Sequence, residues 1–196
     1  MSNEANIAYF GYGSLVNLDT LRTPYISAHR ARIKGWRRVW LQQPAVAGSL
    51  ATIDGLAFLS VEPAPQTSID GLIIIDHQAS LKALDEREEL YERVSLPQGS
   101  VSFEGASPVG TNTPLFLYQA THLRARSDAK ILRSYLDAVM LGYLNQFGEE
   151  GVMRFMQTTM NFDCGILEDR KQPLYPRSVE LSTGQMKMFS KLALPK

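Results

Sequence analysis

The chain of 196 residues has a single cysteine, Cys164, and three histidines. One cysteine excludes an internal disulfide and agrees with a reducing compartment, so the cytoplasm is the expected location. His29, His77 and His122 are far apart, and none has metal-ligand spacing to another histidine or to Cys164. We therefore expect no metal and no other cofactor. A nucleophilic Cys164 paired with a distant histidine is not favoured, because nothing in residues 161–165 would lower the thiol pKa.

The sequence also lacks net charge and long apolar runs. Lys and Arg number 20, and so do Asp and Glu, which gives no electrostatic reason to expect nucleic-acid or anionic-membrane binding. No stretch approaches the length of a membrane span, and residues 1–4 lack the basic start of a signal peptide. We expect a soluble protein with small-molecule partners, folded as a single domain over residues 1–196.

Residues 9–15, with the sequence YFGYGSL, are the most informative segment that is present. Gly11 and Gly13 lack a Cβ, so the backbone can take positive φ and come close to a ligand, with its N–H groups aimed at a carboxylate. The alternative is a strand that ends in a tight turn. A dinucleotide fingerprint is excluded because Val16 replaces its third glycine. A nucleophile elbow is excluded because Tyr12 stands where it needs glycine.

Short β-branched or aromatic runs predict strands at residues 55–61, 69–75 and 114–120. Residues 31–40 predict either one strand or two strands with a turn at Gly35. Within them, the Arg37–Arg38 pair is either a binding patch or part of a solvated strand face.

Helical periodicity predicts a helix from Ser80 to Leu90 and a longer helix that Ser127 or Asp128 caps and that ends near Gly148. The apolar stripe of the longer helix, Tyr135 included, is interpreted as core. A short helix is expected over residues 151–159, followed by an irregular tail from about residue 161. Early strands with later helices indicate the α+β class with a small mixed sheet.

One carboxylate of the first predicted helix lies on its apolar side. At about 100° per residue, Glu88 falls between Leu81 and Leu84, whereas Glu86 and Glu89 point away. Partial desolvation there would raise the pKa of Glu88, which makes it a candidate acid/base group. The alternative is a structural glutamate paired with a nearby arginine such as Arg93.

Two motifs resemble the gamma-glutamylcyclotransferase-like family. Tyr12-Gly13-Ser14-Leu15 is similar to its N-terminal YGSL loop, and Leu84-Asp85-x-x-Glu88 is similar to its LDxxE motif. Tyr91-x-Arg93-Val94 is similar to the strand that follows. The resemblance implies a small mixed β-barrel with flanking helices, a substrate loop at residues 12–15, and Glu88 as the acid/base residue.

The chain departs from the family pattern at two places. Glu89 follows the motif glutamate, where many members have glycine, and this changes the charge beside the pocket. The segment typical of the glutathione-specific branch is absent between Trp40 and Leu59, which argues against glutathione as the substrate.

The implied reaction is attack by the α-amine of a γ-glutamyl amide on its own γ-carbonyl, which releases an amine or amino acid and closes 5-oxoproline. Glu88 takes one proton and gives one back. The backbone around Gly13, Ser14 and Leu15 binds the α-carboxylate or the oxyanion, so the serine is a binder and not a nucleophile. Tyr12 and Tyr118 are either hydroxyl contributors or core tyrosines.

Three alternatives stay open at this point. The first is a binding or regulatory module that keeps the pocket without turnover. The second is an enzyme that trims a γ-glutamyl group from a biosynthetic intermediate by the same cyclisation. The third is a structural or interaction protein. The sequence does not specify the leaving amine or the oligomeric state.

Overall fold

A mixed sheet and three α-helices make up the part of the chain that the computed structural model describes, residues 5–22, 24–42, 55–120 and 128–193. The helices are α1 (Leu81–Arg87), α2 (Arg133–Thr158) and α3 (Thr183–Leu192). The strands are β1 (Asn6–Gly11), β2 (Ser27–Gln42), β3 (Leu56–His77), β4 (Glu92–Ser95), β5 (Val101–Phe103), β6 (Leu115–Gln119), β7 (Lys130–Leu132), β8 (Thr159–Met160) and β9 (Gly165–Leu167).

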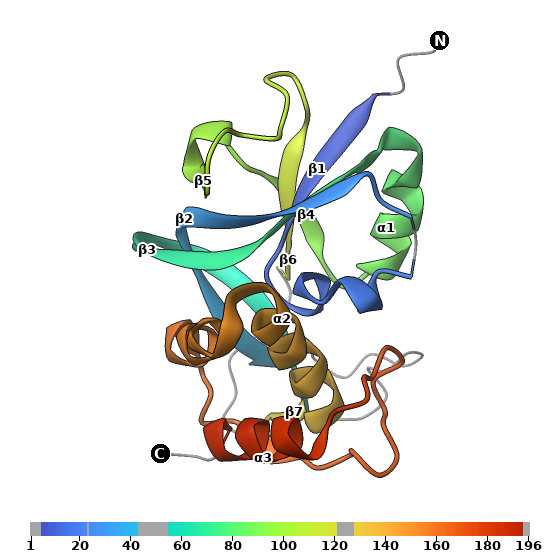
Figure 1. The fold of residues 1–196 in the computed structure, drawn as a ribbon, viewed down its shortest axis with the longest axis vertical. Helices are drawn as coiled ribbons and strands as arrows, with labels where there is room; N and C mark the ends of the chain where they lie inside the picture. Colours follow the sequence, from blue (N-terminus) through green and yellow to red (C-terminus); the bar gives the residue numbers. More distant parts are fainter. Residues whose placement is uncertain (1–4, 23, 43–54, 121–127, 194–196) are drawn as a thin grey trace.

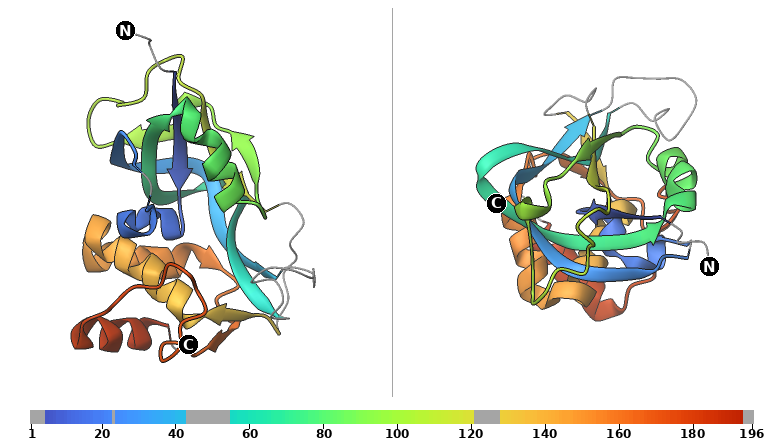
Figure 2. Two further views of the ribbon diagram at one scale, coloured as in Figure 1. Left: turned by 90° about the vertical axis from the view of Figure 1, so that its right-hand side faces the viewer. Right: turned by 90° about the horizontal axis from the view of Figure 1, so that it is seen from above.

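The main strand order is β4-β6-β1-β3-β2-β5. Most neighbours are antiparallel, but β1 pairs with β6 in parallel, so the sheet is mixed. It curls strongly, with α1 beside it, and α2 and α3 lie at the end opposite the N-terminus (Figures 1 and 2). This architecture confirms the predicted α+β class.

The two longest strands, β2 and β3, pair along most of their length. Gly35 has φ +88°, and the register shifts between Lys34 and Trp36. A bulge inserts a residue and bends a strand without ending it, so Gly35 lies within one strand and the alternative of a turn there was wrong. The strands predicted at 55–61 and 69–75 are likewise parts of one strand, β3, joined by mostly exposed residues.

The core forms where β1 lies between β3 and β6, and four successive residues of β1, 7–10, are almost completely buried. Arg38 of β2 is also buried, with 1% of its surface exposed. The interpretation of Arg37 and Arg38 as a solvated pair therefore holds only for Arg37, which forms an exposed ion pair with Glu62. Successive side chains of a strand point to opposite faces, so Arg38, the next residue of β2, points inward.

Helix α2 begins later than predicted. Residues 130–132 pair with β3 as strand β7, so the helix starts at Arg133, and Asp128 does not cap it. Ser127 lies outside the described residues. The cap comes from Asp169, whose Oδ1 accepts the Ser134 N–H at 2.8 Å. The predicted break near Gly148 is confirmed, because that residue has φ +67° and a kink joins two helical segments there.

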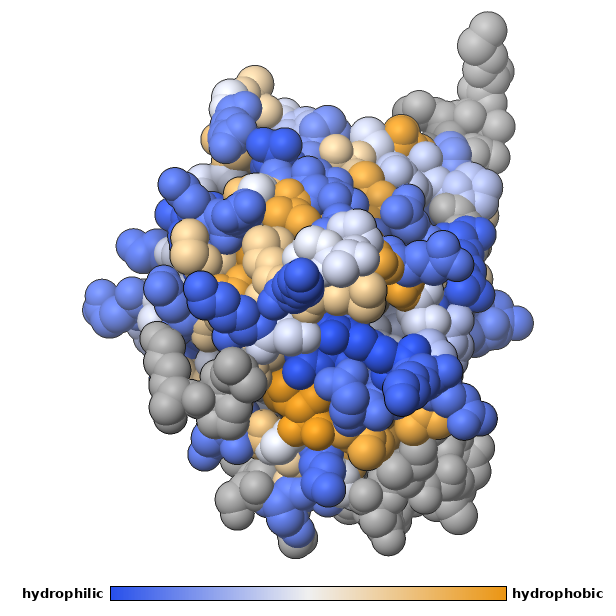
Figure 3. Space-filling model, turned by 60° about the horizontal axis from the view of Figure 1, so that its bottom comes forward, coloured by the Kyte–Doolittle hydropathy of each residue, from blue (hydrophilic) through white to orange (hydrophobic). Residues whose placement is uncertain are grey.

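The tail after residue 161 is not simply irregular, because it contains β9 and α3. Helix α3 begins with a reciprocal capping box between Ser182 and Gln185, and this spacing was a signal in the sequence that the prediction missed. No helix in the described part of the chain is long and apolar enough to span a membrane. The face in Figure 3 is mainly hydrophilic, with smaller hydrophobic areas in both its upper and its lower half.

Candidate active site

Glu88 lies directly after helix α1, which is shorter than predicted. Its N–H still donates to the Leu84 carbonyl at 3.0 Å, so Glu88 keeps the helical position although its φ and ψ are not helical. The side chain points inward and is 16% exposed. Glu86 and Glu89 are exposed, as helical geometry predicted.

The partner of Glu88 is its neighbour in sequence. Arg87 Nε lies 3.0 Å from Glu88 Oε1, and Arg87 also donates to the Thr20 carbonyl. Arg93 instead pairs with Asp85 at 3.1 Å, so Arg93 was the wrong choice of partner. The Arg87–Glu88 pair is largely buried, which weakens solvent screening of its attraction.

Burial raises the pKa of Glu88 above its ordinary value of 4.5, and the positive charges of Arg87 and Arg177 oppose this rise. Desolvation disfavours the ionised carboxylate, whereas the guanidinium groups stabilise it. The result is a carboxylate that is more basic than a solvated one and is also held in place by an ion pair. Such a group can accept a proton and return it.

The loop at residues 12–15 follows β1 directly, and its last two residues begin a 3₁₀ turn, η1 (Ser14–Val16). Neither Gly11 nor Gly13 has positive φ. Glycine is needed at these two positions because other atoms of the protein lie where a Cβ would be. A Cβ on Gly11 would lie 2.6 Å from Leu15 Cβ, and one on Gly13 would lie 2.9 Å from the Tyr135 hydroxyl. A side chain at either position would force neighbours apart.

Buried polar contacts hold this loop against α2 and β2. The Tyr12 carbonyl accepts from Arg38 Nε at 3.1 Å and from the Tyr143 hydroxyl at 2.9 Å. Further along, Asn17 Nδ2 donates to the Ala138 carbonyl at 3.0 Å. Buried polar groups with several satisfied partners rigidify a segment, so the loop geometry is fixed before any ligand arrives.

The two tyrosines predicted at the site use their hydroxyls within the protein. Tyr12 donates to the Tyr118 carbonyl at 2.6 Å, and Tyr118 donates to Asp85 Oδ1 at 2.7 Å. Tyr135, which the sequence placed in the core, has its hydroxyl at the loop instead. Burial raises the pKa of Tyr135 well above 10, although a backbone hydrogen bond from Ser14 opposes this, so the phenol stays neutral.

Two cavities meet at Glu88. The inner cavity, about 30 Å³, brings Glu88 together with every predicted substrate-binding residue, Tyr12, Gly13, Ser14, Leu15 and Tyr118. The outer cavity, about 190 Å³, extends from Glu88 to an apolar wall. Four residues border both cavities, namely Ser14, Glu88, Tyr91 and Tyr135. Glu88 therefore lies at the junction between the two cavities.

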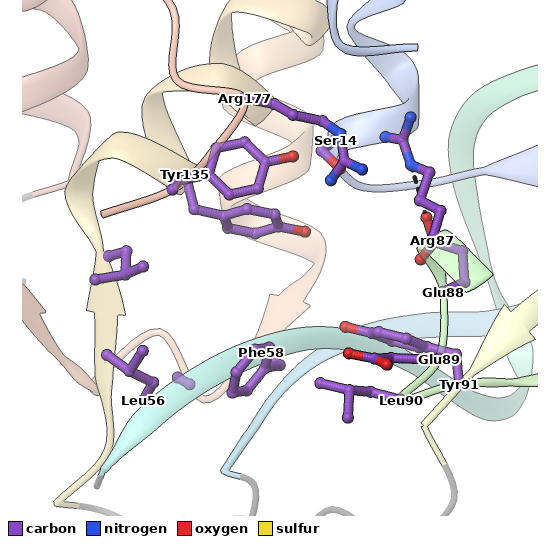
Figure 4. A pocket seen from close by; sticks show the side chains of 13 residues that line it. Ser14, Leu56, Phe58, Arg87, Glu88, Glu89, Leu90, Tyr91, Tyr135 and Arg177 are labelled. Carbon is purple, nitrogen blue, oxygen red and sulfur yellow. Dashed lines mark hydrogen bonds and ion pairs between the residues drawn. The ribbon is translucent and has the colours of Figure 1, made fainter. Parts of the chain in front are cut away.

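The outer cavity contains residues that sequence reasoning missed. Arg87 is the last residue of α1 and Glu89 lies in the turn after it, whereas Tyr175 and Arg177 come from the segment between β9 and α3 (Figure 4). Figure 4 shows Arg177 extending toward Ser14, on the same side as Arg87. No local pattern marks Tyr175 or Arg177, because only the fold of the C-terminal segment brings them to the cavity.

No group of three or more His, Cys, Asp or Glu side chains that could hold a metal ion occurs within the described ranges. The polar groups that converge on Glu88 are guanidinium, phenol and backbone amide groups. Their chemistry is that of anion binding and proton transfer.

Similarity to known proteins is found at the level of structure. No protein-family model and no curated protein matches the sequence. A gamma-glutamyl cyclotransferase matches with a TM-score of 0.60 and 14% identity over 95% of this chain and 99% of that chain. The human protein loc79017 matches with a TM-score of 0.60 and 15% identity over the same shares of the two chains.

YkqA from Bacillus subtilis matches with a TM-score of 0.59 and 14% identity over 78% of this chain and 53% of that chain. The chain thus has the fold of gamma-glutamyl cyclotransferases, and at these identities the likeness establishes the fold alone.

Proposed function

We propose that this protein is a gamma-glutamyl cyclotransferase-type enzyme that converts a γ-glutamyl amide into 5-oxoproline and a free amine or amino acid. The observation that carries the proposal is the place of Glu88, an inward carboxylate of raised pKa at the junction of two cavities and beside the loop of residues 12–15. The cyclotransferase fold supports the same reaction.

In the proposed mechanism the ionised Glu88 takes a proton from the substrate α-ammonium group. The freed amine attacks the γ-carbonyl carbon, and the new C–N bond closes the five-membered ring. Glu88 then gives the proton to the amide nitrogen, and the bond from the carbonyl carbon to that nitrogen breaks. The regenerated Glu88 carboxylate takes the second proton from the ring nitrogen and passes it to the departing amine, so 5-oxoproline leaves as the neutral lactam and the amine leaves as its ammonium ion. General acid-base help of this kind contributes about 10²- to 10⁴-fold.

The rest of the site orients the substrate and stabilises charge. The backbone around Gly13, Ser14 and Leu15 faces the inner cavity, where it can bind the α-carboxylate or the developing oxyanion. The neutral phenol of Tyr135 can donate to the same oxygen atoms. Because Arg38 and Tyr143 hold the Tyr12 carbonyl, the loop needs little reorganisation to do so.

The test is to incubate the pure protein with γ-glutamyl amino acids, γ-glutamyl amines and glutathione, and to measure 5-oxoproline by mass spectrometry. Glu88→Gln keeps the shape of the side chain but cannot accept a proton, so it should fold normally and lose turnover. Glu89→Gln is the control, since Glu89 is exposed, and its effect should be small.

Full turnover by a folded Glu88→Gln protein would contradict the role of Glu88. Ligand binding by the wild-type protein without 5-oxoproline from any substrate would favour the alternative of a binding module.

A further inference from the structure

Arg177 borders the outer cavity, and its side chain is half-buried. Within residues 5–22, 24–42, 55–120 and 128–193, its guanidinium forms no hydrogen bond and no ion pair of its own. Its charge acts on Glu88, but Glu88 is already paired with Arg87. Glu89 also borders the cavity, yet it is exposed and forms no ion pair with Arg177 in this structure. A half-buried guanidinium with this arrangement is suited to an anionic ligand.

Hydrogen bonds hold the three residues that directly precede Arg177. Asp169 Oδ2 accepts the Leu174 N–H at 2.9 Å, and Ser134 Oγ accepts the Tyr175 N–H at 3.2 Å. Arg22 donates to the Pro176 carbonyl at 3.0 Å. These contacts fix the backbone next to Arg177. Because the backbone is already ordered, less entropy is lost when a ligand binds there.

The arrangement of the two cavities indicates which part of the substrate Arg177 meets. Proton transfer by Glu88 requires the reacting amide to lie beside it, at the junction of the cavities. The γ-glutamyl group then faces the loop of residues 12–15, and the leaving group extends into the outer cavity. Arg177 borders only the outer of these two cavities.

The remaining wall of the outer cavity is largely apolar and aromatic. It is formed by Leu56, Phe58, Leu132 and Tyr175. Apolar surface of this kind favours a large hydrophobic substituent. Besides the Arg87–Glu88 ion pair and the exposed Glu89, the outer cavity thus offers a leaving group the Arg177 guanidinium and a hydrophobic wall.

We propose that Arg177 binds a carboxylate on the leaving group, and that the preferred leaving group is an amino acid with a large apolar side chain. The inference rests on the proposed function for the placement of the substrate. It makes Arg177, on the C-terminal segment, a specificity-determining residue for the leaving group.

The test compares two ligands that differ only in that carboxylate, γ-glutamylphenylalanine and γ-glutamylphenethylamine. Their binding is measured by calorimetry on the folded Glu88→Gln protein, alone and with Arg177→Gln added. Lys171→Gln is the matched control, because Lys171 is an exposed cation of the same segment that does not border the cavity. Every protein compared carries Glu88→Gln, so the loss of the Arg87–Glu88 ion pair affects all of the binding measurements equally.

Arg177→Gln should weaken γ-glutamylphenylalanine binding about 10- to 100-fold, the range expected for a charge-assisted pair, and change γ-glutamylphenethylamine binding less than about 2-fold. Lys171→Gln should change neither ligand. γ-Glutamylglycine, which keeps the carboxylate and lacks the apolar group, should bind more weakly than γ-glutamylphenylalanine.

Equal losses for both phenyl ligands would overturn the proposal, since Arg177 would then contact the γ-glutamyl end or act only on structure. No loss for either ligand, or no binding of either, would overturn it too. A separate readout addresses the reaction: if wild-type protein shows this binding pattern but releases no 5-oxoproline, the cyclotransferase function fails and the assignment of Arg177 stands.

Discussion

Arg87 and Glu88, adjacent in sequence, face the same cavity and form an ion pair of 3.0 Å at its inner end. The pair stabilises the ionised form of the desolvated Glu88 carboxylate, because the positive charge of Arg87 opposes the rise of the Glu88 pKa that burial causes. The same contact fixes the direction of the carboxylate. The ion pair therefore sets both the basicity and the position of the proposed acid/base group.

Removing Arg87 should alter the pH dependence of the reaction. In Arg87→Gln the pKa of Glu88 rises further, so the acid limb of kcat/KM should move to higher pH, as measured by 5-oxoproline release across a pH series. Arg93→Gln is the control, because Arg93 pairs with Asp85. An unchanged acid limb in a folded Arg87→Gln protein would show that Arg87 does not control Glu88.

If the proposed reaction occurs, the wild-type protein should lose kcat/KM as the pH falls through the raised pKa of Glu88, because only the carboxylate form accepts the substrate proton. The midpoint of that loss should lie above the ordinary carboxyl value of 4.5. A midpoint at or below this value would argue against a buried catalytic carboxylate.

The free energy of unfolding should also depend on the protonation of Glu88, and the direction of this dependence on pH follows from the raised pKa. The folded-state pKa of Glu88 is raised, so its contribution to stability is present below the unfolded-state pKa and is lost as the pH rises through the folded-state value. Wild-type protein should therefore lose stability relative to Glu88→Gln as the pH rises from the ordinary carboxyl value of 4.5 through the raised folded-state pKa, as measured by urea denaturation. A constant difference between the two proteins would contradict the raised pKa.

Gly142→Ala should disturb the loop of residues 12–15 from a distance. A Cβ at Gly142 of α2 would lie 2.6 Å from the backbone nitrogen of Asn17, so helix and loop must separate. We expect a loss of about 1–3 kcal/mol in the free energy of unfolding, as for overpacked cores, and a higher KM.

The matched control for that change is Gly184→Ala in α3. The nearest atom to a new Cβ there is Ser182 Oγ at 3.9 Å. Unfolding in urea should show no loss of stability, and a gain of about 0.5–1 kcal/mol is expected from helix propensity. Equal destabilisation by both substitutions would rule out the specific contact as the cause.

Asp169→Asn should loosen the C-terminal segment, since one carboxylate caps α2 and also accepts from Ser134 Oγ and Leu174 N–H. An amide cannot accept at both positions, and we expect a loss of about 1–3 kcal/mol by urea denaturation. Weaker binding of γ-glutamylphenylalanine should accompany it. Asp163→Asn, an exposed change, is the control, and a similar loss there would contradict the role of the cap.

Several features could be predicted because they depend on neighbours in the chain. Helical periodicity predicted the inward direction of Glu88, which directly follows α1, and the break at Gly148 followed from one glycine. The burial of Arg38 could not be predicted, because its partners are distant in sequence, from 26 residues for Tyr12 to 105 residues for Tyr143. The start of α2 was misplaced for a similar reason, since Asp169 supplies its cap from 35 residues further on.

The sequence by itself determined the strand-to-loop segment at residues 9–15, the inward direction of Glu88 and the α+β class. These follow from backbone freedom and side-chain periodicity, which act over a few residues. Only the tertiary structure decided that Arg87 is the partner of Glu88, that Tyr135 reaches the loop, and that Tyr175 and Arg177 complete the outer cavity. Those contacts depend on side-chain rotamers and on the path of the sheet, the helices and the C-terminal segment, which local sequence patterns do not encode.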